Sequence, residues 1–382
     1  MTTGTDHAGM ERRIDAYLDL GRGQGASDIH LTAGLPPLVR VDGELIPAEH
    51  PPLGEEAIRA LILPILSDDQ RRVLEERGSV DLSYHSDAHG RFRINICRHL
   101  HGTAAICRVI PSDIPRLADL GLPSTVGRLT AFRSGLVLVT GPTGTGKSTT
   151  LAALVHEINR EKSLNILTLE EPVEFLHRSM RSQVVQREVG TDVPSFEAGL
   201  RAALREDPDV ILVGELRDPA TISLALEAAE TGHFVLGTLH TRGAHQTIDR
   251  IVDAYPAEAQ VQVRHTLADN LRCVLSQELV RAADGRGRRL AMEILVGTPA
   301  VAQLIRDGKT FQLQTAIATG RRVGMQLMDL ALMSLVRAGE IDPNEAFLRA
   351  TDKREFIYFV TDKELLHLVG NPGTEPRSER AA

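Results

Sequence analysis

Residues 141–148 read Gly-Pro-Thr-Gly-Thr-Gly-Lys-Ser, and no other stretch limits the fold of this chain as strongly. They fit the pattern G-x-x-x-x-G-K-[ST], in which a glycine-rich loop joins a strand to a helix. The flanking residues agree with that order, because Leu136–Val139 is a short apolar run of the buried-strand type and Thr149–Asn159 has a helical pattern. The sequence therefore predicts a strand, a phosphate-binding loop and a helix in succession.

This loop predicts a nucleotide site. Its glycines let the backbone curl until N–H groups point inward at the phosphates, and the start of the helix adds a favourable dipole. Lys147 is expected to reach the β- and γ-phosphates, and the Ser148 hydroxyl is expected to ligate Mg²⁺. The residues predicted to bind ATP are Gly141, Pro142, Thr143, Gly144, Thr145, Gly146, Lys147, Ser148 and Thr149.

Two other segments carry carboxylates where a strand is expected to end. Glu215 follows the apolar strand 210–214, at the strand end where ligands bind in open α/β sheets. Glutamate is one methylene longer than the aspartate usual at this position, so it could hold Mg²⁺ through a water molecule. The segment 167–174 ends in Glu170, Glu171 and Glu174, a cluster that suits a metal site or the polarisation of water. Solvated loop carboxylates are the ordinary alternative for all of these.

Histidines flank another apolar strand, 234–238. His233 precedes this strand and His240 follows it. The strand should end at the same sheet edge as Glu215, where an imidazole could sense the γ-phosphate by hydrogen bonding. A hydrogen-bonded core histidine is the alternative for either residue.

The length of 382 residues exceeds one comfortable core and predicts two or three domains. The first part has the pattern of a small α/β unit, and the Pro-bearing segment 110–115 is the expected linker. The expected N-terminal elements are helices over 12–20, 55–66 and 67–77, a hairpin over 38–45 that turns at Asp42-Gly43, and strands over 80–86, 90–98 and 103–109. Beyond residue 123 the pattern changes to apolar strands that alternate with helices, which predicts a mainly parallel sheet covered on both faces.

The strands expected in that sheet are 135–140, 165–169, 210–214, 234–238 and 290–296. Helical periodicity follows over 300–306, 312–319, 326–338 and 344–350. The predicted boundaries are an N-terminal domain over 1–110, a linker over 111–123, a core over 124–298, a helical region over 299–370 and a disordered tail over 371–382.

Composition narrows the class of partner and the compartment. The chain has 43 basic and 51 acidic residues, and its net charge of −8, with no tryptophan and only 3% aromatic residues, argues against nucleic acid as a partner. Its three cysteines form no C-x-x-C pair, so a reducing compartment is expected. No signal peptide and no apolar run of transmembrane length is found, which predicts a cytoplasmic protein that could dock on a membrane complex.

Together these motifs resemble the secretion-ATPase superfamily and, within it, the twitching-motility ATPases that retract type IV pili. Residues 26–37 resemble that family's N-terminal opening, and 141–150 its Walker A motif. Residues 204–218 resemble the signature around an atypical, glutamate-bearing Walker B motif. The acidic cluster resembles the family's Asp box, and the strand with His233 and His240 its His box.

The resemblance implies a RecA-like P-loop core with an N-terminal PAS-like α/β domain and a helical C-terminal region. It implies Glu174 as general base, Glu215 as the residue serving metal and water, and His240 as phosphate sensor. The N-terminal domain would close on the nucleotide and bring arginines, for which Arg93 and Arg108 are the candidates. The implied cofactors are ATP and Mg²⁺. The implied partners are further copies of the chain in a hexamer, an inner-membrane pilus platform protein and a paralogous retraction ATPase.

Two departures from the family pattern leave open whether the chain is the main or the accessory retraction ATPase. Glu170-Glu171-Pro172 stands where Glu-Asp-Pro is usual. Residues 300–307 differ at half of the positions from the retraction motif Ala-Ile-Arg-Asn-Leu-Ile-Arg-Glu, and with the basic segment 284–289 they point to the accessory retraction ATPase. Three rival hypotheses are a pilus-assembly or type II secretion ATPase, a RecA-type nucleic-acid translocase and a non-catalytic, nucleotide-sensing scaffold, the last disfavoured by the intact set of Lys147, Ser148, Glu174 and Glu215. The assembly and secretion enzymes are usually longer and often carry a C-x-x-C insert, which this chain lacks.

The pattern of residues 300–307 also predicts a helix with one buried and one exposed face. At helical spacing, Ala300, Val301, Leu304 and Ile305 form one apolar face, expected to pack on the core. The opposite polar face, with Arg306, is then expected to be available to a partner.

Overall fold

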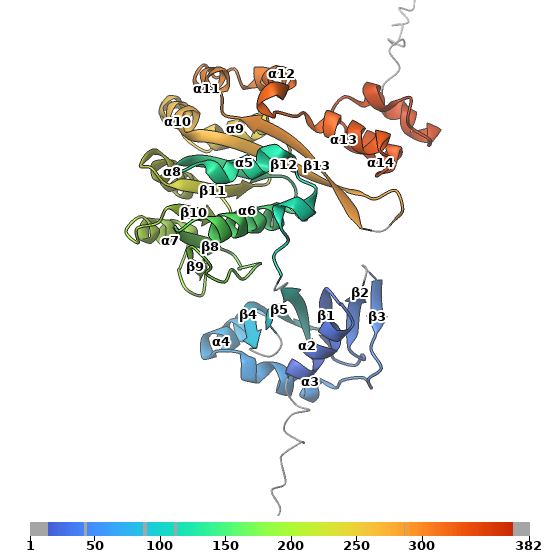
Figure 1. Ribbon diagram of the computed structural model, residues 1–382. Coiled ribbons are helices and arrows are strands. Elements are labelled where there is room, and N and C mark those ends of the chain that lie inside the picture. Colours follow the sequence, from blue (N-terminus) through green and yellow to red (C-terminus); the bar gives the residue numbers. More distant parts are fainter. Residues whose placement is uncertain (1–13, 42–43, 87–89, 111–112, 286, 370–382) are drawn as a thin grey trace, which may run out of the picture. The chain divides into compact units, whose positions relative to one another are not determined.

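The computed structural model describes residues 14–41, 44–86, 90–110, 113–285 and 287–369 (Figure 1). The chain divides into two compact units, one of residues 1–113 with 174–176 and the other of residues 114–173 with 177–382. The expected turn at 42–43, the start of the first expected helix and the expected tail over 371–382 lie outside the described residues. The finer boundaries at 110, 123, 298 and 370 stay predictions.

The N-terminal unit is built on a six-stranded antiparallel sheet in the order β3-β2-β1-β6-β5-β4. Its strands are β1 Asp28–Thr32, β2 Leu38–Val41, β3 Glu44–Pro47, β4 Ser79–Ser86, β5 Gly90–His99 and β6 Gly102–Ile110. Its helices are α2 Ile14–Gly23, α3 Glu55–Ile62 and α4 Asp68–Arg77, with a 3₁₀ turn η1 at Leu63–Ile65.

One face of this sheet forms the core of the unit. Successive side chains of a strand point to opposite faces, so Phe92 and Ile94 of β5 are buried with Ile29 of β1, while Arg93 lies on the other face. The helix α4 begins with a capping box, in which Ser67 and Gln70 satisfy each other's backbone N–H groups. The unit therefore has one apolar and one polar sheet face.

The C-terminal unit is built on a seven-stranded sheet in the order β13-β12-β7-β11-β10-β8-β9. All neighbouring pairs are parallel except β12 and β13. Its strands are β7 Gly135–Thr140, β8 Asn165–Glu170, β9 Gln183–Glu188, β10 Val210–Val213, β11 Phe234–Leu239, β12 Leu271–Arg281 and β13 Arg288–Val296. Its helices are α5 Ser124–Arg128, α6 Lys147–Glu161, α7 Phe196–Ala203, α8 Pro219–Glu230, α9 Ala244–Asp253, α10 Ala257–Asn270, α11 Pro299–Arg306, α12 Leu313–Thr319, α13 Met328–Arg337 and α14 Pro343–Arg349.

The central strand β7 is buried along its whole length, as its apolar sequence predicts. Leu136 and Leu138 point into the core on one face of the sheet, and Val137 and Val139 point into the core on the other. The helices α13 and α14 form a separate core around Phe347 that also includes Val280 of β12 and Ala291 of β13. The predicted fold class, α/β with a separate N-terminal unit, is confirmed.

Three strands were not predicted. These are β1, β9 and β12, and β12 lies directly beside β7. The pattern of β12 is interrupted by Ser276 and Gln277, but both side chains are buried because they hydrogen-bond to the phosphate-loop region. Polar residues in a buried strand hide its apolar pattern from the sequence.

The prediction for the faces of 300–307 is partly wrong. In α11, Val301 and Ile305 are buried, but Ala300 is exposed. The polar Arg306 forms an ion pair with Asp269 at the end of α10, and its side chain is 31% exposed, so its availability to a partner stays a prediction. Helix periodicity places a residue on a side of its own helix but cannot tell which neighbouring element covers that side.

Candidate active site

The predicted site residues of the C-terminal unit gather at one edge of its sheet. The strands β7, β11, β10 and β8 are parallel neighbours, so their carboxyl ends lie side by side (Figure 1). The phosphate loop follows β7, His240 follows β11, Glu215 follows β10 and Glu170 ends β8. This is the edge where open α/β sheets bind ligands.

The phosphate loop has the curled backbone that its glycines predict. Gly141 and Gly146 have φ of 139° and 86°, in the region that favours glycine. A Cβ atom on Gly141 would lie 2.4 Å from the carbonyl oxygen of Gln277, so the close packing on β12 also requires glycine there. The loop leads into α6, whose first residue is Lys147.

The ammonium group of Lys147 is buried beneath this loop. Its Nζ donates to the carbonyl oxygens of Gly141, at 2.8 Å, and Pro142, at 3.0 Å. Ser148 follows as the second residue of α6 and is half-buried. A buried cation and a hydroxyl at a helix start can receive phosphate oxygens and a hard cation.

The strand β12 and the hairpin after it support the loop from a part of the chain that the sequence did not indicate. Gln277 Nε2 donates to Thr150 Oγ1 at 2.6 Å, and the hydroxyls of Ser276 and Thr140 lie 2.8 Å apart. Arg288 Nη1 donates to the carbonyl oxygen of Gly144, at 3.3 Å. In the sequence, Ser276 and Gln277 directly follow the apolar run 273–275, and this pair of polar residues was the signal that could have indicated a buried hydrogen-bonding role.

Glu215 and His240 lie together, as their positions after neighbouring strands predict. His240 Nε2 is 3.3 Å from Glu215 Oε1. A residue that sequence reasoning did not single out joins them, because Arg217 contacts Glu215 Oε2 at 2.7 Å and Glu171 Oε2 at 3.1 Å. Burial would raise the pKa of Glu215, but the hydrogen bond and charge of Arg217, followed by His240, outweigh it and hold that pKa below its ordinary value.

The three carboxylates of the predicted Asp box have different surroundings. Glu170 Oε1 accepts hydrogen bonds from Thr168 Oγ1, at 2.6 Å, and from Gln186 Nε2, at 3.1 Å. Glu171 is bound to Arg217. Glu174 is exposed, and within the described part of the chain it makes no hydrogen bond or ion pair. Of the three, Glu174 has both carboxylate oxygens available.

Arg93 and Arg108 are cross-strand neighbours in the N-terminal sheet. They face each other in the register of β5 and β6, and both are exposed on the sheet face opposite the core. Arg108 Nε donates to Asp28 Oδ1 at 2.8 Å, while Arg93 lies 3.8 Å from Asp81. Burial would raise the pKa of Asp28, but hydrogen bonds from Ser27 and Arg108 and the charge of Arg108 lower it. Two guanidinium groups are therefore presented side by side.

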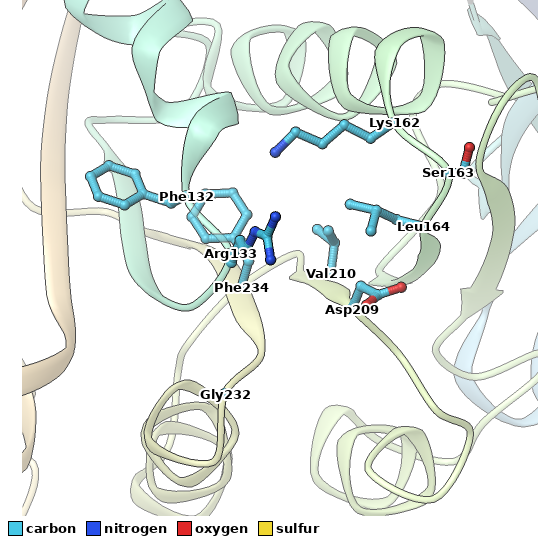
Figure 2. A pocket seen from close by; sticks show the side chains of 9 residues that line it. All are labelled: Phe132, Arg133, Lys162, Ser163, Leu164, Asp209, Val210, Gly232 and Phe234. Carbon is cyan, nitrogen blue, oxygen red and sulfur yellow. The ribbon is translucent and has the colours of Figure 1, made fainter.

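A pocket of about 630 Å³ lies at the opposite edge of the C-terminal sheet (Figure 2). Val210 and Phe234, which line it, are the first residues of β10 and β11, whereas Glu215 and His240 follow the last residues of these strands. A six-residue strand such as β11 is about 20 Å long, so this pocket is separate from the phosphate loop. Lys162, at the end of α6, also lines it and donates to the carbonyl oxygen of Thr130.

None of the helices in the described ranges is both long enough and apolar enough to cross a bilayer.

A family model of type II/IV secretion system proteins matches residues 3–352, most of the chain. The chain belongs to this family. The secretion ATPase is 48% identical to the type IV pilus retraction ATPase PilT of Pseudomonas aeruginosa over 343 residues, which are 90% of this chain and 99% of PilT. It is 37% identical to the type IV pilus ATPase PilU of the same organism over 348 residues, 90% of this chain and 91% of PilU.

A solved structure extends this similarity to the fold. The crystal structure of the pilus retraction motor PilT with bound ADP matches the secretion ATPase with a TM-score of 0.84 and 43% identity, over 90% of this chain and 98% of that one. The resemblance inferred from the motifs is confirmed: the protein is an ATPase of the secretion and pilus ATPase family.

Proposed function

We propose that this ATPase powers the retraction of type IV pili. It would act as a homo-oligomer, a hexameric ring, that docks from the cytoplasm on an inner-membrane platform protein of the pilus machine. One observation carries the proposal: near full-length similarity to PilT coincides with a phosphate loop that lies at the same sheet edge as Glu215 and His240. Homo-oligomerisation would place many copies of the same site around one pilus base.

Nucleotide binding would begin at Lys147. In the structure its ammonium group donates to two loop carbonyls, and these bonds would be exchanged for bonds to the β- and γ-phosphates of ATP. The N–H groups at the start of α6 would add their partial positive charge. The exchange would link phosphate binding to the position of the loop.

The donor set at this edge fits Mg²⁺, because hydroxyl and carboxylate oxygens are the ligands that this hard cation prefers. Ser148 would hold the ion directly, and Glu215 would hold it through water. The bound ion would supply positive charge to the phosphates.

Glu174 would take the proton of the attacking water. Its exposed carboxylate is not held by a hydrogen bond or ion pair in the described chain, in contrast to Glu170 and Glu171. Glu215, kept ionised by Arg217, would orient the water and hold His240. His240 would then report the presence of the γ-phosphate to β11 and the residues after it.

Arg93 and Arg108 are the proposed source of positive charge from the N-terminal unit. Their side-by-side arrangement on an exposed sheet face suits an anion with several oxygens. Each is paired with a single aspartate at the sheet, so part of each guanidinium group remains available.

Higher identity to PilT than to PilU supports a role as the main retraction motor, although residues 300–307 depart from the retraction motif. A paralogous accessory ATPase would then be a partner.

Deletion of the gene tests this function directly. Loss of retraction should leave cells with excess surface pili and without twitching, and expression of the Lys147→Ala variant should not restore motility. Cells without surface pili would instead identify an assembly ATPase, and turnover that depends on DNA would identify a nucleic-acid translocase. Unchanged piliation and motility would also contradict the proposal.

A further inference from the structure

The strand β12 carries a buried side-chain amide directly beside the start of α6. Gln277 is 1% exposed, and its Nε2 donates to Thr150 Oγ1 at 2.6 Å. Thr150 is also buried, and it is the fourth residue of α6, where its backbone N–H donates to the carbonyl oxygen of Gly146. The amide of Gln277 is therefore bonded to the first turn of the helix that begins with Lys147 and Ser148.

The residue before Gln277 holds the other end of the phosphate loop. Ser276 Oγ lies 2.8 Å from Thr140 Oγ1, and both residues are completely buried. Thr140 is the last residue of β7, whereas Thr150 lies in the first turn of α6. Two adjacent polar residues of β12 thus hold both ends of the segment 141–149, which contains the residues predicted to bind ATP.

The amide of Gln277 is only partly satisfied. Its Oε1 is buried and has no hydrogen-bond partner in the part of the chain that the structure describes. A buried acceptor without a partner destabilises a fold, whereas replacement of both members of a buried polar pair by apolar groups can be neutral or stabilising. Stability alone therefore does not account for an amide at this position. Its one bond, to Thr150, acts on the nucleotide site.

We propose that Gln277 is a positioning residue for the phosphates of the nucleotide. By holding Thr150, it fixes the first turn of α6, and with it the places of the Lys147 ammonium group and the Ser148 hydroxyl. Gln277 acts through Thr150 and needs no contact with the nucleotide. The inference rests on nucleotide binding by this ATPase family and is independent of the proposed pilus function.

The expected effect follows from the fraction of molecules whose loop can receive phosphates. Without the hydrogen bond, the first turn of α6 can take other positions, and the apparent dissociation constant rises as the competent fraction falls. A hydrogen bond of this kind is worth up to about tenfold in such an equilibrium. ADP and ATP should be affected alike, because both carry a β-phosphate. The rate at saturating ATP should change little, since bound nucleotide restores the competent position.

Nucleotide titration of the full-length protein tests this role. Gln277→Met has nearly the same size and lacks the amide. It should raise the Kd for fluorescent ADP about three- to tenfold and the KM for ATP by a similar factor, while kcat stays within about twofold of the wild type. A wild-type Kd in Gln277→Met would overturn the proposal, and so would a loss of kcat without a change in affinity.

Asn159→Leu is the matched control. Asn159 is a fully buried amide of the same helix, where its Nδ2 donates to the carbonyl oxygen of Arg178, at 2.7 Å, and its Oδ1 accepts from the N–H of Met180, at 3.0 Å. It lies about 14 Å beyond Thr150 along α6. This variant should unfold at a lower urea concentration and keep the wild-type Kd for ADP. An equal rise in Kd in Asn159→Leu and Gln277→Met would assign the effect to general destabilisation and overturn the proposal.

Variants of Thr150 test the same contact from its other partner, and they replace Gln277→Met if that variant does not fold. Thr150→Val loses the hydroxyl and should raise the Kd for ADP to a similar extent, whereas Thr150→Ser keeps a hydroxyl and should keep the affinity. The double variant Gln277→Met/Thr150→Val should bind no more weakly than the weaker single variant, because both changes remove one hydrogen bond. Effects that multiply in the double variant would overturn the proposal.

All of these measurements use purified protein. A failure of the pilus proposal would appear in the piliation of cells and would leave these affinities unchanged.

Discussion

Lys147 is the residue whose charge the phosphate loop is built around. Its replacement by alanine removes that charge and both hydrogen bonds to the loop carbonyls. We expect Lys147→Ala to abolish turnover and to weaken ATP binding, as measured by ATPase assay and by fluorescent-nucleotide titration. Lys162→Ala, at the other end of the same helix, is the control and should keep turnover. Wild-type hydrolysis by Lys147→Ala would refute the site.

Glu174 is the second residue whose role is open to a direct kinetic test. Glu174→Gln should bind nucleotide nearly as the wild type does and hydrolyse it about 10²–10⁴ times more slowly, the usual contribution of a positioned base. Single-turnover kinetics measure this effect. Glu171→Gln is the comparison, because Glu171 is engaged by Arg217 and should matter less. A large loss in Glu171→Gln with none in Glu174→Gln would mean that the wrong carboxylate has been assigned.

His177 predicts a pH dependence of stability. Burial, followed by the charge of His156, lowers the pKa of His177 from 6.5 to about 4. Between these values the unfolded chain binds a proton that the folded chain does not, so stability is present above pH 6.5 and is lost as the pH falls toward 4. Urea unfolding at several pH values should show a weaker acid dependence in His177→Gln. His265→Gln, at an exposed position of α10, should leave the dependence unchanged.

At the scale of elements, the contact between α10 and α11 bears on whether the segment 300–307 serves an internal contact or a contact with a partner. Arg306 and Asp269 form an ion pair whose arginine side chain is 31% exposed, and such pairs contribute only about 0–1 kcal/mol. Arg306→Glu should therefore keep near-normal ATPase activity but reduce twitching in cells, because two like charges push α11 away from α10. Motility and ATPase assays of the same variant separate the two effects.

The charge-swapped variant Arg306→Glu/Asp269→Arg distinguishes an internal contact from a partner contact. We expect the swap to restore twitching, since it rebuilds the ion pair with its sign reversed. Twitching that stays low in the swapped variant would instead indicate that Arg306 contacts a partner, as its position on the helix first predicted.

At the scale of the whole molecule, the chain places its nucleotide loop in one unit and its candidate arginines in the other. Both arginine side chains are exposed, so Arg93→Ala/Arg108→Ala should fold normally. If the N-terminal unit supplies them to the phosphates, the rate constant for hydrolysis should fall about 10³-fold or more. Arg98→Ala, at another exposed position of β5, should have little effect. Unchanged turnover in the double variant, with light scattering showing an intact oligomer, would reject this role.

The sequence alone was sufficient to predict the phosphate loop and the strands β7, β8, β10 and β11. It was also sufficient to predict that Glu215 and His240 lie close together. The physical reason is that these features depend on neighbouring residues or follow from the geometry of parallel sheets. A strand, a glycine-rich turn and a helix start need only neighbouring residues, and parallel strands end at one edge whatever their order.

Only the tertiary structure decided how distant segments support that edge. Ser276 and Gln277 are polar, yet β12 buries them because their partners, Thr140 and Thr150, come from more than a hundred residues away. The pairing of Arg217 with Glu171 joins two loops in the same way. Glu293 of β13 accepts a hydrogen bond at the start of α9, from the N–H of Ala244, which lies 49 residues away along the chain. A hydrogen bond depends on where atoms meet in space, and a sequence pattern records only the neighbours along the chain.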